Sequence, residues 1–230
     1  SSLEKQIYTS EYRAQKEGGN TMQIITDPAG KELKKHGDSS FPFLVSYERL
    51  SGYETGSFLW HWHPEIELTY IEKGEMLYKI NQNTFHLKEG QAIFGNANAL
   101  HAGYMYQDQD CQYIPITFDP KLIYGFSGSL LFQKYTEPIL RSSLSAVPLD
   151  LSCKWHSEAI KDIRDIIDLD CSREPMYEFE VIARLQHFWK ILYEIRSPGQ
   201  FFHPVRMKKT TAASVRSCPI LQNTTLKRSS

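Results

Sequence analysis

The stretch Gly56-Ser-Phe-Leu-Trp-His-Trp-His-Pro-Glu-Ile-Glu67, followed by Gly74, is the most informative part of this chain. His61 and His63 are separated by one residue, so on a β-strand their side chains lie on one face and the two flanking tryptophans on the other. Glu67 follows four residues later, where the chain can bring its carboxylate back to the imidazoles. Imidazole and carboxylate together suit a first-row transition metal, or a polar ligand that needs hydrogen-bond donors and acceptors.

A third histidine closes a second stretch anchored by glycine, Gly90-Gln-Ala-Ile-Phe-Gly-Asn-Ala-Asn-Ala-Leu-His101. Three histidines and one carboxylate could hold Zn, Ni, Fe or Mn with bonds of about 2.0–2.2 Å and leave one coordination position open. The same groups could instead bind a ligand by hydrogen bonds alone. We therefore predict a ligand site, and an optional metal site, made of four side chains: His61, His63, Glu67 and His101. Tyr78 is expected to form a wall of this site, because it combines an apolar ring with a polar hydroxyl.

The remaining histidines are weaker candidates. His86 lies on a predicted hairpin strand, and His156 and His187 lie on predicted helices, where a surface or packing role is expected. His36 and His203 lie in polar stretches that are expected to be flexible. The sequence contains no Ser/His/Asp pattern, no Walker loop and no GxGxxG motif, so it does not indicate a serine hydrolase or these nucleotide-binding folds.

From Phe41 to Asp119 the chain has the texture of an all-β domain. Short runs rich in Val, Ile, Tyr, Phe and Trp alternate with Gly, Asn, Asp and Lys breaks. Apolar side chains recur every second residue over 76–80 and 114–118, which predicts strands with one buried face, and Asn81-Gln-Asn83 predicts a tight hairpin turn. Strands are expected at 43–50, 57–62, 66–73, 75–80, 84–88, 91–94, 100–107 and 111–118.

The β texture ends at Pro120, and two helices are predicted further along the chain. The first, at about 155–170, carries one apolar stripe. The second, at about 175–196, repeats apolar residues in steps of four and three, the spacing of a helix–helix seam: Val181, Leu185, Phe188, Leu192 and Ile195. This seam either packs on its own barrel or contacts a second copy, and the pattern leaves both open. Because an exposed stripe would favour aggregation, we expect a two-fold homodimer.

The bulk composition is that of an ordinary globular protein. The chain has 230 residues, with 41% hydrophobic and 23% charged residues, which is enough to bury a full core. It has no long apolar run and no signal-peptide core, so we expect a cytoplasmic protein without a membrane partner. The four cysteines are scattered and form no CxxC pair, as expected for unpaired thiols in a reducing compartment.

Charge is distributed unevenly along the chain. Seven basic residues and no acidic residue follow Glu194, although the formal net charge of the whole chain is only −1. The part up to Glu194 therefore holds 19 basic and 27 acidic residues. An acidic body of this kind is not typical of a nucleic-acid surface, so DNA is not expected to bind the globular part.

The two histidine stretches resemble the two cupin motifs, and from about Leu33 to Ser197 the sequence resembles the N-terminal sensor half of AraC-type bacterial transcription regulators. The matching segments are Lys34-Lys-His-Gly37, Phe41-Pro-Phe43, the core from His61 to Gly74, Leu87 to His101, and Ile116-Thr-Phe-Asp-Pro120. The second cupin motif usually has Pro and Gly where this chain has Asn96 and Asn98. Within the first motif, the spacing to the closing glycine favours Glu67 over its neighbour Glu65 as the ligand.

The resemblance implies a cupin-type antiparallel β-barrel, or double-stranded β-helix, followed by two dimerisation-type helices. It also implies a small polar, sugar-like effector, a homodimer through the C-terminal helices, and DNA binding only by a separate C-terminal half with two helix-turn-helix units. We expect a polar arm over 1–40, the barrel over 41–119, a mainly helical dimerisation segment over 120–197 and a basic polar tail over 198–230. The alternative is a stand-alone metal-dependent cupin enzyme, an isomerase or dioxygenase, whose open metal position does the chemistry.

The tail after Arg196 is too short for two helix-turn-helix units. It is either a disordered or cloning-derived extension or the product of a frameshift near Lys209. If the residues after Lys209 are back-translated and the codons are read in a shifted frame, they permit a peptide such as DNCGIRKIMSYIAEHYTEKII. Its I-x-x-Y-I-x-x-x-Y pattern resembles the start of the first DNA-binding helix of the family. We therefore expect the sensor half of a regulator that has lost its DNA-binding half, and not an enzyme.

Overall fold

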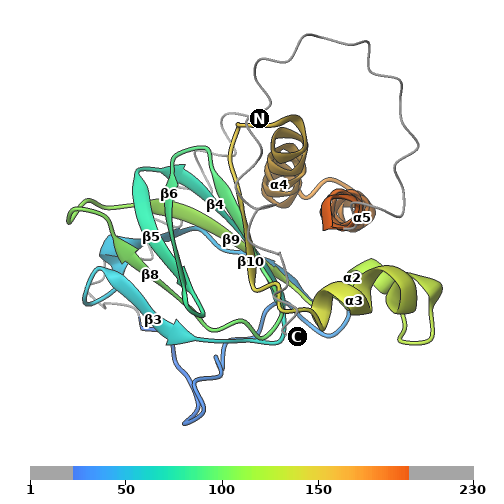
Figure 1. The fold of residues 1–230 in the computed structure, drawn as a ribbon, viewed down its shortest axis with the longest axis horizontal. Helices are drawn as coiled ribbons and strands as arrows, with labels where there is room; N and C mark the ends of the chain where they lie inside the picture. The colour runs from blue at the N-terminus through green and yellow to red at the C-terminus, as the bar shows by residue number, and fades with distance from the viewer. Residues whose placement is uncertain (1–22, 197–230) are drawn as a thin grey trace, which may run out of the picture.

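Two antiparallel sheets form the body of the computed structural model, which describes residues 23–196 (Figure 1). Expectations for 1–22 and 198–230, the frameshift near Lys209 and His203 included, lie outside the described residues. The first sheet has the order β1-β9-β4-β7-β10, with β2 also paired to β9, and the second has the order β3-β8-β5-β6. The strands of the first sheet are β1 (Phe43–Val45), β2 (Glu48–Arg49), β4 (Ile66–Lys73), β7 (Ala92–Gly95), β9 (Gln112–Phe118) and β10 (Ala146–Leu149). Those of the second are β3 (Ser57–His61), β5 (Glu75–Ile80), β6 (Asn83–Lys88) and β8 (His101–Met105).

The predicted fold class, a cupin-type antiparallel β-barrel followed by helices, is confirmed. The predicted strand over 43–50 is divided into β1 and β2, and the other predicted strands are found with small shifts at their ends. The predicted hairpin turn is also present. Ile80 pairs with Asn83, and Asn81 takes a positive φ of 49°, a conformation that asparagine tolerates in two-residue turns.

The prediction that β structure ends at Pro120 was wrong. Residues 146–149 form β10, which pairs with β7 at the edge of the larger sheet, with Val147 opposite Phe94. This strand is short and contains Pro148, which cannot donate a backbone hydrogen bond and is tolerated in a sheet only at an edge. A four-residue run with a proline inside it therefore lacks the sequence signal of a strand.

Alternation along β4 explains how the polar site enters the barrel. Ile66 and Leu68 are fully buried in the core between the larger sheet and the helices. Glu67 and Thr69 lie on the opposite face of the strand, where the Tyr78 hydroxyl of the smaller sheet donates to the Glu67 carboxylate. Because the side chains of a strand alternate, one apolar-polar-apolar-polar run builds both the outer core and the floor of the barrel interior.

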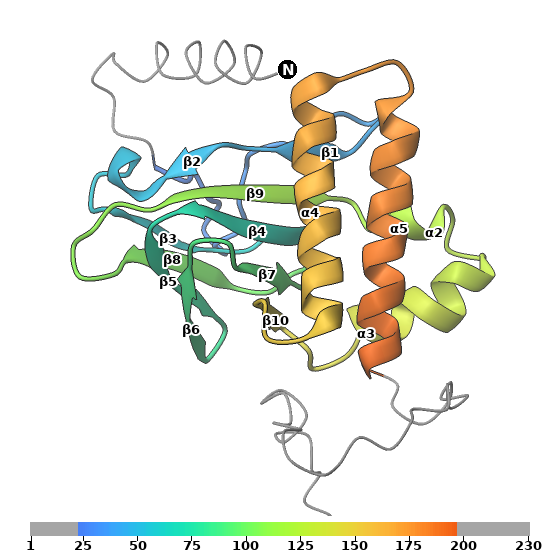
Figure 2. The same cartoon turned by 90° about the horizontal axis from the view of Figure 1, so that it is seen from above.

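Two long helices, α4 (Lys154–Ser172) and α5 (Tyr177–Arg196), lie side by side over the larger sheet (Figure 2). The shorter elements are η1 (Leu50–Gly52), α2 (Lys121–Tyr124), the π-helix η2 (Leu131–Thr136) and α3 (Glu137–Leu140). The sequence did not decide whether the apolar stripe of α5 packs on its own chain or on a second copy. In the structure it packs on its own chain, in the core shared with α4 and the larger sheet, through Val181, Leu185, Phe188 and Leu192. Among the helices of residues 23–196, none has the length and apolar character needed to cross a membrane.

Candidate functional site

A cavity of about 570 Å³ lies in the barrel and is lined by both sheets and by the segment 23–36. Aromatic rings form part of its wall, from Tyr53, Phe58 and Tyr113. Polar side chains from three strands reach the same space: His61 of β3, Glu67 of β4 and His101 of β8. The cavity thus combines flat apolar surfaces with charged and hydrogen-bonding groups, the usual composition of a small-molecule site.

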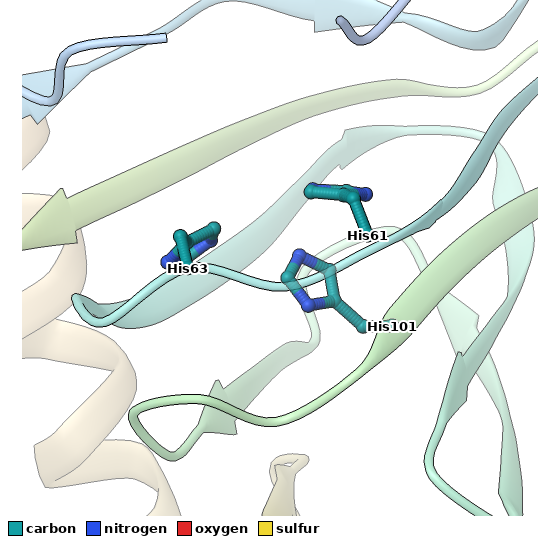
Figure 3. Close-up of side chains that lie close together, drawn as sticks. All are labelled: His61, His63 and His101. Atoms are coloured by element: carbon teal, nitrogen blue, oxygen red, sulfur yellow. The ribbon is translucent and has the colours of Figure 1, made fainter. Parts of the chain in front are cut away.

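Three histidines point toward one another at this place (Figure 3). His61 ends β3, His101 begins β8, and the two residues are paired across the strands. His63 follows β3 by two residues. A ligand nitrogen from each ring lies within 4.8 Å of the other two, and all three residues are buried. The one-residue spacing of His61 and His63 and the strand pairing with His101 therefore produce the cluster together.

Backbone carbonyls fix the orientation of two of these rings. The Nδ1 atom of His61 lies 2.8 Å from the Leu59 carbonyl oxygen, and the Nδ1 atom of His101 lies 2.9 Å from the Ala99 carbonyl oxygen. Because a carbonyl only accepts, Nδ1 is the donor in both contacts, which leaves Nε2 of each ring for a ligand. The Nε2 atom of His101 is buried and has no hydrogen-bond partner among the described residues. Such a nitrogen is available to a metal or to a donor group of a ligand.

The Glu67 carboxylate is held from one side and faces the histidines from the other. Its Oε1 accepts hydrogen bonds from the Thr69 hydroxyl at 2.6 Å and from the Tyr78 hydroxyl at 2.9 Å. Its Oε2 lies 3.4 Å from Nε2 of His63 and 3.6 Å from Nε2 of His101. Two fixed donors on Oε1 thus orient the carboxylate so that Oε2 is directed into the histidine cluster.

Burial and neighbouring charges set the protonation of these groups. Burial raises the pKa of Glu67, but the charges and hydrogen bonds of His101 and His63 outweigh it and hold that pKa well below its usual range. Burial, with a smaller contribution from His101, lowers the pKa of His61 to about 4, so this imidazole is neutral at neutral pH. Burial and the Glu67 charge raise the pKa of Tyr78 well above its usual range, so its hydroxyl stays protonated and donates.

This arrangement fits a first-row transition metal. Bonds of about 2.0–2.1 Å at octahedral to tetrahedral angles place neighbouring donor atoms about 3.0–3.4 Å apart. The separations of 3.4 and 3.6 Å from Glu67 Oε2 to the two Nε2 atoms are close to that range. The third histidine of the cluster, His61, offers its Nε2 from the opposite strand. The donor set and the unpartnered Nε2 of His101 are therefore suited to a metal, and equally to a polar ligand.

Comparison with known proteins adds the family. Residues 45–151 match the model of the AraC-like ligand binding domain. This segment is an AraC-like ligand-binding domain. The chain is also 26% identical over 170 residues to the uncharacterized HTH-type transcriptional regulator YdeC of Bacillus subtilis, a match that covers 74% of this chain and 57% of that protein. The chain therefore spans little more than half the length of this relative.

Two solved structures match parts of the chain. ToxT of Vibrio cholerae, bound to (E)-4-(8-methylnaphthalen-1-yl)but-3-enoic acid, matches with 9% identity and a TM-score of 0.48, over 67% of this chain and 57% of that one. A predicted oxalate decarboxylase of Thermotoga maritima matches with 22% identity and a TM-score of 0.30, over 33% of this chain and 64% of that one.

The AraC-like domain places some predicted site residues differently from the expectation. Tyr78 is not on the cavity wall; it is fully buried beneath the site, where it donates to Glu67. His63 belongs to the histidine cluster but does not line the cavity. Glu65, the alternative to Glu67, lies 3.5 Å from the other ring nitrogen of His63, Nδ1.

The expectation that His36 lies in a flexible stretch was wrong. His36 is buried, its Nδ1 lies 2.8 Å from the Thr117 hydroxyl, and its ring centroid is 4.7 Å from that of His63. The segment that carries it is fastened to the barrel, because the Trp62 indole donates to the Ala29 carbonyl at 2.9 Å. No local sequence pattern announces this contact, since His36 and Thr117 are 81 residues apart.

The other three histidines of residues 23–196 have partners away from the cavity. The three pairs are His86 with Glu75 at 2.6 Å, His156 with Asp150 at 2.7 Å, and His187 with Asp162 at 2.6 Å. These are surface and packing roles, as the sequence predicted for all three.

Proposed function

We propose that this chain is the effector-sensing part of a bacterial transcription regulator and that the cavity of the AraC-like domain binds a small, polar, sugar-like effector. The observation that carries the proposal is the buried polar set, His61, Glu67 and His101, on the wall of a cavity of about 570 Å³. Burying such groups is costly unless they are hydrogen-bonded, and a polyhydroxylated ligand supplies both donors and acceptors.

The composition of the wall supports this ligand class. Carboxylates of Glu32 and Glu67 face the cavity and accept hydrogen bonds from hydroxyl groups. The aromatic rings of Phe58 and Tyr113 offer flat surfaces for the C–H faces of a sugar ring. A ligand with several hydroxyl groups and no large apolar part matches both features.

The proposal includes an optional divalent metal. His61, His63, His101 and Glu67 would hold it, because their donor atoms are gathered, buried and oriented from outside the cluster. A metal in this place would act as a Lewis acid that binds an oxygen of the effector. The protein side chains alone would orient the same effector by hydrogen bonds if the metal is absent.

The proposal assigns DNA binding to the remainder of a longer regulator and places the protein in the cytoplasm. The matched relative is an HTH-type regulator of which the alignment covers 57%. The part of this chain up to Glu194 has 27 acidic and 19 basic residues, a charge that does not favour contact with phosphates.

We retain the homodimer as part of the proposal but move its contact surface. The apolar stripe of α5, which was expected to form the dimer contact, is buried within the chain. We therefore assign the dimer contact to three exposed side chains, Phe126, Leu130 and Leu131, which are 69%, 66% and 46% exposed. Leu131 also lines an apolar groove of about 530 Å³ beside α5. Exposed apolar surface of this kind marks protein contacts. Light scattering should give a dimer mass that Leu131→Glu reduces and Phe179→Glu leaves intact, whereas a monomer mass for the unmodified chain would contradict the dimer.

A thermal-shift panel of neutral sugars, polyols and sugar acids tests the function. We expect a stabilising compound whose affinity falls at least about tenfold, or 1.4 kcal/mol, in Glu67→Gln. Glu75→Gln is the matched control, because Glu75 is a partly exposed glutamate that also faces a histidine. A ligand that binds Glu67→Gln as well as the unmodified chain would place the effector site elsewhere.

One observation favours the enzyme as a second candidate. Three histidines and one carboxylate beside a cavity are also the donor set of a catalytic metal centre with an open position. Turnover of a sugar or small acid that is lost on chelation and restored by a divalent metal would establish the enzyme. Binding without turnover, with or without metal, would support the sensor.

A further inference from the structure

A second cluster of metal-ligating side chains lies beside the first. Glu32, His36 and His63 each offer one donor atom within 4.8 Å of the other two. Two of these residues belong to the segment that closes the cavity and not to the four residues proposed for the first metal. His63 is shared by both clusters, and its ring centroid lies 4.7 Å from that of His36.

The second cluster is buried, and two of its ring nitrogens lie near carboxylates: Nε2 of His36 is 3.0 Å from Glu32 Oε2, and Nδ1 of His63 is 3.5 Å from Glu65 Oε2. The side chains of His36 and Glu32 are 6% and 7% exposed, and His63 is 3% exposed. Nε2 of His36 and Nδ1 of His63 are buried nitrogens without a hydrogen-bond partner among the described residues. Buried polar atoms of this kind are rare, and a bound ion is one of their ordinary explanations.

The distances are compatible with a shared metal. Oε2 of Glu32 lies 3.0 Å from Nε2 of His36. Donor atoms on one metal with bonds of about 2.0–2.1 Å lie about 3.0–3.4 Å apart. The Thr117 hydroxyl, 2.8 Å from Nδ1 of His36, fixes that ring from outside the cluster, as second-shell groups do at metal sites.

From this geometry we propose a second divalent-metal site formed by Glu32, His36 and His63. Two imidazoles and one carboxylate are a set that binds Zn²⁺ and its first-row neighbours. The site ties the segment 31–36 to the barrel, because its first two ligands come from that segment and the third from the loop after β3. The inference goes beyond effector sensing and does not depend on which effector binds.

Zinc stoichiometry separates the two sites. The whole chain is stripped with a chelator, reloaded with Zn²⁺, dialysed and analysed for zinc by mass spectrometry. We expect two zinc ions per chain, which requires the shared His63 ring to release its remaining ring proton to solvent and bridge the ions as an imidazolate, with one nitrogen on each ion. One zinc should remain in His36→Ala or Glu32→Gln, one in His101→Ala, and none in the double variant His36→Ala/His101→Ala. His86→Ala is the matched control, because His86 faces a carboxylate outside both clusters, and it should keep both ions.

The remaining outcomes also decide the proposal. A single zinc that is lost in His36→Ala and kept in His101→Ala supports the second site. A single zinc that is lost in His101→Ala and kept in His36→Ala overturns the second site. Three other results also overturn it: one zinc that is lost in both variants, two zinc ions that are retained in His36→Ala, or no bound zinc in the unmodified chain. Glu32→Gln keeps the test valid if His36→Ala fails to fold. Because the readout is zinc and not effector binding, failure here leaves the sensor function untouched.

Discussion

The Tyr78 hydroxyl is the group whose removal tests the site most cleanly, since Tyr78→Phe deletes one oxygen and keeps the ring. That hydroxyl donates to Glu67 Oε1 at 2.9 Å in a fully buried place. A hydrogen bond to a charged group is worth about 1.5–3 kcal/mol, and loss of a group that orients a metal ligand costs about 10–100-fold in metal affinity. At 1.4 kcal/mol per factor of ten, the loss in metal affinity corresponds to about 1.4–2.8 kcal/mol of binding free energy.

The assay has two parts on the same protein. Urea denaturation in chelator should show Tyr78→Phe less stable by about 1.5–3 kcal/mol. Zinc titration should show weaker binding by about 10–100-fold, because Oε2 loses its fixed direction. Tyr70→Phe is the matched control: Tyr70 lies on β4, and its hydroxyl makes no hydrogen bond within residues 23–196.

The outcome that would refute this reasoning is equality of the two variants. If Tyr78→Phe matched Tyr70→Phe in both stability and zinc affinity, the Tyr78 hydroxyl would not be the group that orients the Glu67 carboxylate. A double-mutant cycle of Tyr78→Phe with Glu67→Gln adds a second check, because residues that share a hydrogen bond should show a coupling energy of at least about 0.5 kcal/mol.

Three further predictions concern packing and reactivity. Leu185→Ala, in the buried stripe of α5, should lower the free energy of unfolding by about 2–5 kcal/mol in urea, while the exposed Lys190→Ala changes it little; equal effects would contradict the packing of α5. Gly103→Ala places a Cβ atom against the Phe58 ring, so it should lower the free energy of unfolding by about 1–3 kcal/mol in urea. A cost that does not shrink in a Phe58→Leu background would show that this clash is not the cause. Burial raises the pKa of the Cys111 thiol to about 12. At about pH 8 we therefore expect Cys111 to be alkylated more slowly than the partly exposed Cys153, as measured by peptide mass spectrometry. Equal alkylation rates would contradict the burial of Cys111.

Local patterns predicted the elements whose burial follows from periodicity. The run Ile66-Glu-Leu-Thr alternates as a strand that is apolar on one face and polar on the other, and it is β4. The apolar stripe of the predicted helix at 155–170 is the buried face of α4, which includes Ile163 and Ile166. The predicted gathering of His61, His63 and His101 is found in the structure, although only His61 and His101 lie on paired strands and His63 follows the end of β3.

Contacts between distant segments were not predictable in the same way. β10 exists because Ala146–Leu149 meets the free edge of β7, a partner that its own four residues do not encode. His36 is part of the site because Thr117 and His63 lie beside it in space. The role of Tyr78 was misjudged for a related reason. The sequence placed it on the inner face of β5, but only the position of Glu67 on the facing sheet shows that it lies beneath the site and not on the cavity wall.

The central claim is that the effector binds among the buried histidines of the barrel, and histidine-selective NMR tests it most directly. The ring resonances of the chain are recorded in chelator while the sugar, polyol and sugar-acid panel is added. The account predicts that a stabilising compound shifts the resonances of His61 and His101 and leaves those of His86 and His187, which lie outside the cavity, in place. A compound that stabilises the protein and moves His86 or His187 while His61 and His101 stay unchanged would contradict it.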